Sequence, residues 1–170
     1  RATGDVIVAH TVFEERGGLG MKHLLESGSV EPGAVVIGES TQGDVCIGHR
    51  GRGEVEVVVH GLAGHASAPD RAHNALDPVP EVLAAVHELA RDQPEDPVLG
   101  ASSLVVTGVD VLPESRNVIP DRVTIVLDWR VLPGTDDEAM TSRVREAVNR
   151  RLGELPDGFS VTISMAREQQ

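Results

Sequence analysis

The chain has 170 residues, of which 40% are hydrophobic and 25% charged, a composition typical of a globular protein rather than a disordered one. The formal net charge of -12 argues against nucleic-acid binding, because phosphate backbones need a clustered basic face. Aromatic residues make up only 2%, so the core must be aliphatic, and Cys46 as the only cysteine excludes an internal disulfide. No apolar run approaches the roughly 20 residues of a membrane span. We expect neither nucleic acid nor a membrane as a partner, and we expect a cytoplasmic location.

The first 50 residues predict a strand, a helix and a second strand. Residues 5–12 form a β-branched run, residues 19–27 carry an apolar stripe at helical spacing, and residues 34–38 form another apolar strand. A strand–helix–strand unit of this length predicts parallel strands, which are buried on both faces. Because two strands and one helix cannot cover such a sheet, we expect a piece of a larger α/β domain and interpret the chain as a fragment.

Residues 51–166 predict a complete second domain. Its expected elements are a strand at 54–60, a helix at 78–91, strands at 103–111 and 122–132, a helix at 136–152 and a strand at 159–165. Along the strand at 122–132, apolar residues alternate on one face and Arg130 lies on the other. The order βαββαβ predicts the split ferredoxin-like arrangement.

Three acids, Glu14, Glu15 and Glu39, follow the two strands predicted in the first 50 residues. Functional side chains gather at the carboxyl ends of parallel strands. Consecutive residues of an extended segment point to opposite sides, so tandem acids can have different roles. Carboxylate oxygens are suitable zinc ligands, but these residues are too few to close a metal site, and the chain has no HExxH motif. Solvated loop acids are the alternative that the spacing alone favours.

Two further groups carry chemistry on loops and strands. His65 lies among small residues in the run from Gly64 to Pro69, where a histidine can donate to a developing oxyanion; an ordinary surface histidine is the alternative. Arg130 follows the segment that contains Asn117, and an arginine fork commonly holds a carboxylate. The alternative for Arg130 is a sheet-surface salt bridge with Asp128 or a neighbour.

Five stretches, in this order and covering nearly the whole chain, resemble the two-zinc amidohydrolase family of aminoacylase, acetylornithine deacetylase, succinyl-diaminopimelate desuccinylase and carboxypeptidase G. They are Thr11–Gly18, Val36–Thr41, His49–Gly53, His60–Pro69 and Asn117–Pro120. The resemblance implies a partial catalytic domain with a parallel sheet over residues 1–50. It also implies a ferredoxin-like lid domain over residues 51–166, through which members commonly dimerise, and a return to the catalytic domain beginning at residues 167–170.

For the first domain, the resemblance implies a base and two metal ligands. Glu14 resembles the general base that takes a proton from the water bound to zinc. Glu15 resembles a ligand of one zinc ion and Glu39 a ligand of the other, with cobalt or manganese as substitutes. The family usually has Asp where this chain has Phe13, immediately before the pair of glutamates. The remaining metal ligands of the family match no segment of this chain.

For the lid domain, the resemblance implies contacts with the substrate. His65 resembles a histidine that stabilises the tetrahedral oxyanion, often across a homodimer, and Asn117 and Arg130 resemble residues that hold the substrate, Arg130 through its carboxylate. The implied reaction is hydrolysis of the amide bond of an N-acyl amino acid or short peptide. The alternative function is a stand-alone ferredoxin-like module for dimerisation or small-ligand binding, without catalysis.

Overall fold

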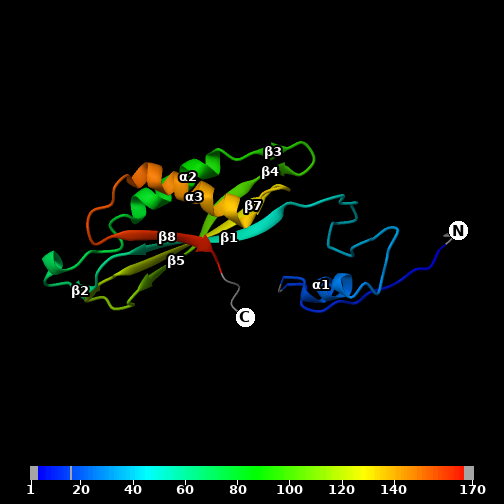
Figure 1. Cartoon of the computed structure of the whole chain (residues 1–170), viewed down its shortest axis with the longest axis horizontal. Coiled ribbons are helices and arrows are strands. Elements are labelled where there is room, and N and C mark those ends of the chain that lie inside the picture. Colours follow the sequence, from blue (N-terminus) through cyan, green and yellow to red (C-terminus); the bar gives the residue numbers. More distant parts are fainter. Residues whose placement is uncertain (1–3, 16, 167–170) are drawn as a thin grey trace. The chain divides into compact units, whose positions relative to one another are not determined.

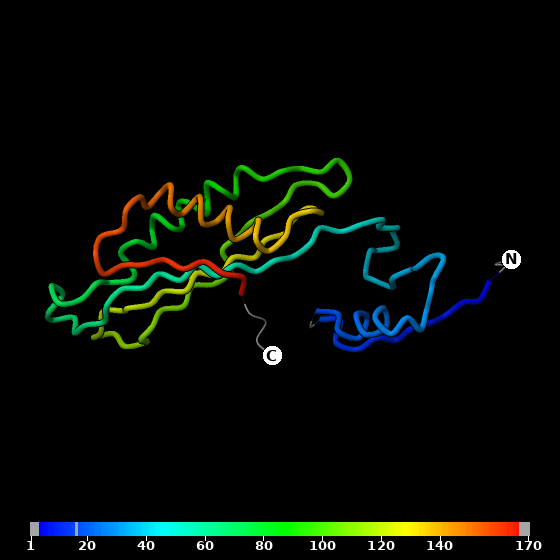
Figure 2. Tube along the Cα trace, in the orientation of Figure 1, coloured from blue at the N-terminus to red at the C-terminus, as the bar shows by residue number. Residues whose placement is uncertain are grey.

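A computed structural model provides the structure of the protein and describes residues 4–15 and 17–166. The chain consists of two compact units, residues 1–45 and 46–170, drawn as a ribbon in Figure 1 and as a Cα trace in Figure 2. Residues 167–170, which are predicted to begin the return to the catalytic domain, lie outside the described residues. None of the helices in the described part of the chain is long and apolar enough to cross a membrane.

The first unit contains one helix, α1 (Leu19–Glu26), and no strand among its described residues. The helix was predicted and is confirmed, whereas the strands predicted at residues 5–12 and 34–38 are not formed. A strand needs a partner for its backbone N–H and C=O groups, and a parallel strand also needs cover on both faces. Neither condition is met within this unit, and Val8 and Val36 are 74% and 95% exposed.

The second unit is built on a four-stranded antiparallel sheet with the order β5-β7-β1-β8. Its strands are β1 (Gly51–His60), β5 (Ser103–Leu112), β7 (Arg122–Val131) and β8 (Ser160–Met165), and its helices are α2 (Val79–Arg91) and α3 (Asp137–Leu152). This order and these connections are those of the ferredoxin-like arrangement. The predicted fold of residues 51–166 is therefore confirmed.

Short elements decorate this sheet. They are β2 (Gly64–His65) paired with β6 (Val118–Ile119), β3 (Glu95–Asp96) paired with β4 (Gly100–Ala101), and the 3-10 helix η1 (Pro69–Arg71). All of them lie in the connections between the long strands and helices.

Both long helices cover one face of the sheet (Figure 1), and the core lies between them and the strands. Alternate residues of β1 and β7 point into this core, as the period of two in these strands predicts; they are Val55, Val57, Val59, Val123, Ile125, Leu127, Trp129 and Val131. Val82 and Val86 of α2 and Val144 of α3 pack against them. Asp136 caps α3, accepting a hydrogen bond at Oδ1 from the Ala139 backbone N–H (2.8 Å). The opposite face of the sheet carries mainly polar side chains.

The buried Trp129 determines the packing at one end of the core. Its indole N–H donates to Gln93 Oε1 (2.9 Å) and Ser102 Oγ (3.1 Å), so its polar atom is satisfied inside the core. Gly53 lies opposite Trp129 on β1, and a Cβ at Gly53 would lie 2.5 Å from Met140 Cε. A side chain at this position would therefore displace Met140, which is buried in the same core cluster as Trp129.

Val57→Ala is expected to lower the free energy of unfolding of this chain by about 2 kcal/mol, because it removes two buried methyl groups and leaves a cavity. Val57 is fully buried, whereas Val98, between β3 and β4, is 67% exposed. Val98→Ala removes the same two methyl groups and should change stability by less than about 0.5 kcal/mol. Urea titrations of both variants measure the difference, and equal losses would contradict this description of the core.

Candidate functional site

The predicted site residues fall into two groups, one in each unit. Glu14, Glu15 and Glu39 belong to the first unit, whereas His65, Asn117 and Arg130 belong to the second. All six side chains are exposed to solvent. Each group therefore presents polar atoms that a ligand could reach.

Glu14 and Glu15 lie in the turn that leads into α1. The backbone N–H of Gly18 closes this turn by donating to the carbonyl oxygens of Phe13 and Glu14, both at 3.1 Å. Phe13 has a φ of 56°, in the left-handed region where Asp and Asn are enriched and bulky residues are rare. The Asp that the family usually has at this position would adopt the same backbone more readily than Phe13.

Glu39 is exposed, and its Oε1 accepts a hydrogen bond from the Ser40 backbone N–H (3.0 Å). Within the described residues, no group of three or more His, Cys, Asp or Glu side chains could hold a metal ion. The carboxylates of Glu15 and Glu39 are chemically suitable for zinc, so they fit as part of a ligand set. The described residues do not complete that set.

His65 and Asn117 are brought together by the short sheet of β2 and β6. His65 pairs with Val118 in this sheet, and the backbone N–H of Ala66 donates to the carbonyl oxygen of Asn117 (3.0 Å). Ser115 Oγ donates to Asn117 Oδ1 (2.7 Å). The amide N–H₂ group of Asn117 donates to no acceptor among the described residues, so it remains available to a ligand. Two residues 52 positions apart thus form one cluster of donors.

The glycines before His65 allow the chain to fold back closely. The backbone N–H of Leu62 donates to His73 O (2.8 Å), and that of His73 donates to Leu62 O (2.9 Å). A Cβ at Gly61 would lie 2.1 Å from His73 O, so only glycine permits this approach. Gly61 is therefore needed to place the loop that carries His65.

The hydrogen bonds of His65 select one tautomer of its ring. Nδ1 accepts from the backbone N–H of Ser67 (3.2 Å) and lies 2.7 Å from Ser67 Oγ. Because Nδ1 accepts a backbone N–H, it carries no proton, and the neutral ring has its proton on Nε2. An exposed Nε2–H donor is what stabilisation of an oxyanion requires. Ser67 therefore orients His65.

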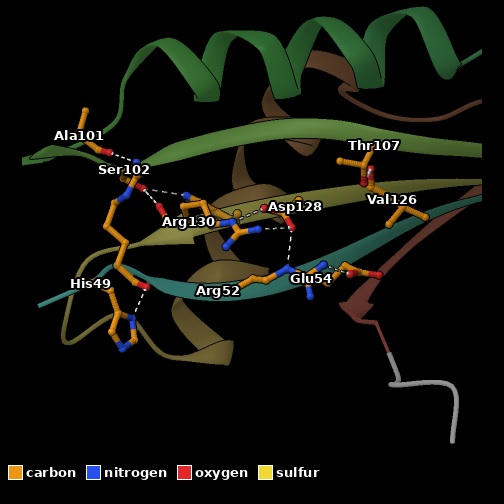
Figure 3. A network of polar contacts seen from close by, with 11 residues as sticks. His49, Arg52, Glu54, Ala101, Ser102, Thr107, Val126, Asp128 and Arg130 are labelled. Carbon is orange, nitrogen blue, oxygen red and sulfur yellow. Dashed lines mark hydrogen bonds and ion pairs between the residues drawn. The ribbon is translucent and has the colours of Figure 1, made fainter. Parts of the chain in front are cut away.

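Arg130 belongs to a cluster of charges on the open face of the sheet (Figure 3). Arg130 Nε contacts Asp128 Oδ1 at 2.8 Å, and Arg52 Nε contacts Asp128 Oδ2 at 2.7 Å. Arg52 also binds Glu54 Oε2 through Nη2 (2.9 Å). The salt bridge between Arg130 and Asp128 that the sequence left as an alternative is therefore present.

Sequence reasoning missed the second arginine of this cluster. The sequence pattern that could have indicated it is a spacing of two residues, in Arg52-x-Glu54 and in Asp128-x-Arg130. This spacing places the two charges of each pair on the same face of a strand. The register that sets Arg52 directly opposite Arg130 is a property of the folded sheet.

The two arginines change the ionisation of Asp128. Burial raises the pKa of its carboxyl, but the hydrogen bonds and positive charges of Arg52 and Arg130 outweigh burial, so the pKa is lowered from its ordinary value. A carboxyl whose pKa is lower in the folded state contributes stability above its unfolded pKa of about 3.9. This contribution is lost as the pH falls through the folded pKa.

Asp128→Asn is accordingly expected to reduce stability more at pH 7 than at pH 2 to 3. Urea titrations of this chain over that pH range measure the difference from the unchanged chain, which should shrink as the pH falls below about 4. Asp110→Asn, at an exposed carboxylate of β5, is the matched control. A loss of stability for Asp128→Asn that does not change with pH would show that the ion pairs make no contribution.

Within the second unit, Arg130 lies at the opposite end of β7 from the loop that carries His65. Arg122, at the first end, pairs with His60 just before the loop of His65, whereas Arg130 pairs with Arg52 near the start of β1. Eight residues of extended strand span about 26 Å. Figure 2 shows the loop of residues 61–75 at one end of the sheet and the start of β1 at the other. Arg130 and His65 of one chain are therefore far apart.

Residues 47–156 match the family model of the peptidase dimerisation domain. The chain belongs to this family. The matched part of the peptidase dimerisation domain includes three of the four long strands and both long helices. The resemblance is thereby confirmed, as is the predicted α/β class with its ferredoxin-like domain. The partial parallel sheet predicted over residues 1–50 is not formed within the described residues.

Curated relatives of this peptidase dimerisation domain include hydrolases of amide bonds. The chain is 30% identical over 170 residues to succinyl-diaminopimelate desuccinylase 2 of Ruegeria sp. (strain TM1040), covering 95% of this chain and 42% of that protein. It is 28% identical over 166 residues to acetylornithine deacetylase of Myxococcus xanthus, covering 95% and 43%. The uncharacterized protein YgeY of Escherichia coli (strain K12) is 31% identical over 141 residues, covering 82% and 35%. The chain spans less than half the length of each of these relatives.

Solved structures share the fold. A hydantoinase/carbamoylase family amidase from Burkholderia ambifaria has a TM-score of 0.51 at 20% identity, covering 68% of this chain and 27% of that one. An amidase of the same family from Burkholderia phymatum also has a TM-score of 0.51, at 15% identity, covering 68% and 28%. At these identities the likeness concerns the fold alone.

Proposed function

We propose that the intact protein is a zinc-dependent amidohydrolase or peptidase that hydrolyses the amide bond of N-acyl amino acids or short peptides. The match of residues 47–156 to the peptidase dimerisation domain supports this function, as do relatives named as a desuccinylase and a deacetylase. Residues 1–50 are then a part of the catalytic domain, residues 51–166 the lid, and residues 167–170 the start of the return. The strands predicted at 5–12 and 34–38 would find their partners in the rest of the catalytic sheet. The predicted cytoplasmic location stays a prediction.

In this proposal the first unit supplies a base and two metal ligands. Glu15 and Glu39 would each bind one of two zinc ions, with cobalt or manganese as substitutes, and the remaining ligands would come from outside the described residues. Bound zinc lowers the pKa of water to about 7 and polarises a carbonyl group. Glu14 would accept the proton of the attacking water, because a carboxylate within hydrogen-bonding reach can act as a general base.

The observation that supports the role of the lid is the distance between Arg130 and the pair formed by His65 and Asn117. His65 and Asn117 would donate to the scissile carbonyl, and Arg130 would bind the carboxylate of the substrate. About 26 Å of strand lies between the two groups, which is more than an N-acyl amino acid spans. Both groups can contact one substrate only if they come from different chains. We therefore assign the lid to a homodimer in which each active site takes His65 from the partner subunit.

The edge of the sheet offers a surface for this homodimer. Of the two edge strands, β5 and β8, β5 is the longer, and its Val105 and Val109 are 52% and 47% exposed. A long edge strand with exposed apolar side chains is a template for pairing with another chain. Pairing of β5 with its symmetry mate would continue the sheet across the dimer.

The test is an activity screen of the full-length protein, carrying its flanking segments and loaded with zinc. N-acetyl amino acids, N-succinyl amino acids and dipeptides are the substrates, and release of the free amine is the readout. Hydrolysis that is lost after chelation and restored by zinc is the expected result. The alternative, a stand-alone ferredoxin-like module, predicts no turnover of any of these substrates. A flanking reading frame without a His-x-Asp segment upstream would favour that alternative.

A further inference from the structure

Two arginines lie directly opposite each other on neighbouring strands. Arg52 of β1 and Arg130 of β7 are cross-strand partners, and both side chains are on the open face of the sheet, with exposures of 56% and 48%. Like charges directly opposite in an antiparallel pair are destabilising. Asp128 offsets this repulsion by pairing with both arginines. Two arginines held by one carboxylate on an exposed face can be reached by an anionic ligand.

A single carboxylate lies between the two guanidinium groups. Asp128 accepts from both arginines: its shortest contacts are Oδ1 with Arg130 Nε at 2.8 Å and Oδ2 with Arg52 Nε at 2.7 Å. Its side chain is only 13% exposed, so it is the least accessible member of the cluster. Figure 3 shows the carboxylate between the two arginines. Asp128 therefore restrains both guanidinium planes at once.

The two arginines differ in the number of carboxylates that they bind. Arg52 binds two carboxylates, Asp128 through Nε at 2.7 Å and Glu54 through Nη2 at 2.9 Å. Arg130 has only Asp128, bound at Nε and, at 3.5 Å, at Nη2. Within the described residues Arg130 Nη1 has no partner. Arg130 also lines a surface pocket together with Gly48, His49, Arg50, Val98 and Leu99.

From this geometry we propose that Asp128 is a positioning residue, which holds Arg130 by the edge that contains Nε, so that Nη1 and the second N–H of Nη2 can bind the carboxylate of the substrate. The proposal rests on the proposed function, in which Arg130 binds that carboxylate. Arg52 holds the second oxygen of Asp128 and so keeps the carboxylate from rotating away. A guanidinium that is already oriented loses less side-chain freedom on binding, which strengthens binding of the charged group.

The test compares two substrates that differ only in charge. The substrates are the best N-acyl amino acid from the activity screen and its C-terminal carboxamide, and the enzyme is the full-length zinc-loaded protein. Asp128→Asn should raise KM for the carboxylate substrate about tenfold, because a charge-assisted contact no longer orients Arg130. The kcat for this substrate and the kcat/KM for the carboxamide should stay within about twofold. Asp128→Glu, which keeps the charge, should restore part of the KM.

Glu54→Gln is the matched control, because it removes the other carboxylate partner of Arg52 without touching Arg130. It should leave KM for both substrates unchanged. Equal losses on the carboxylate and the carboxamide would show that Asp128 is merely structural and would overturn the proposal. An unchanged or lower KM of Asp128→Asn for the carboxylate substrate would also overturn the proposal. It would mean that the arginines bind the substrate equally well without Asp128 to orient them. If the unmodified enzyme hydrolyses neither substrate, the proposed function fails first and this inference fails with it.

Discussion

Glu14→Gln in the full-length enzyme is expected to lower kcat by about 10²- to 10⁴-fold, the usual contribution of a general base. Glutamine has nearly the same shape as glutamate but cannot accept the proton of the attacking water. If Glu14 is the base and not a metal ligand, zinc content should stay the same. Measurements of kcat and of bound zinc by atomic emission on the same preparation separate the two roles.

Two neighbouring variants make this test specific. Glu15→Gln should reduce bound zinc together with activity, because it removes a proposed ligand. Glu26→Gln, at the end of α1 and exposed, removes an equal charge from the same unit and should change neither quantity. Unaltered turnover in Glu14→Gln with unaltered zinc would refute the role of base. Loss of zinc in Glu14→Gln would instead make it a ligand.

Mixed dimers of His65→Ala and Arg130→Ala chains are expected to recover activity that neither variant has alone. Loss of an oxyanion donor should lower kcat about 10²- to 10³-fold, and loss of Arg130 should raise KM. If each site takes His65 from one chain and Arg130 from the other, one of the two sites in a mixed dimer has both changes and the other has none. Purified mixed dimers should then have about half the activity of the unmodified enzyme.

The control uses two residues from the same end of one lid. His65 and Asn117 are neighbours through the β2 and β6 pairing, so a mixed dimer of His65→Ala and Asn117→Ala chains has one defect in each site. This dimer should recover nothing. Dimers carrying differently tagged subunits, purified by both tags in sequence, allow the comparison at saturating and low substrate concentrations. Absence of recovery in the His65 and Arg130 mixture would mean that each site is built from a single chain.

Local patterns predicted the second unit well. The alternation from Val123 to Val131 places five apolar residues on one face, and all five are buried in the structure. A period of two identifies a strand, and its apolar half identifies the face that packs against helices. The stripe of valines in α2 carries the same information at the helical period. Because these elements find all their partners within residues 51–166, local sequence was sufficient to predict their arrangement.

The first unit shows where such patterns fail. Residues 5–12 and 34–38 have the composition of buried strands, yet they form none in the described structure. An apolar, β-branched composition indicates that a segment can form a strand when other elements bury it. The strand forms only where a neighbouring strand pairs with its backbone N–H and C=O groups. The α1 helix, whose hydrogen bonds are internal, forms without such a neighbour.

The sequence by itself determined the elements of the lid, the family and the residue types at the candidate sites, because these depend on local periodicity and on motifs of contiguous residues. Only the tertiary structure decided which of these residues meet. Strand register set Arg52 against Arg130 with Asp128 between them, and the length of β7 separated Arg130 from His65. Register and separation follow from the pairing of segments that are distant in the sequence, such as Arg52 and Arg130, 78 residues apart, a relation that no local pattern contains.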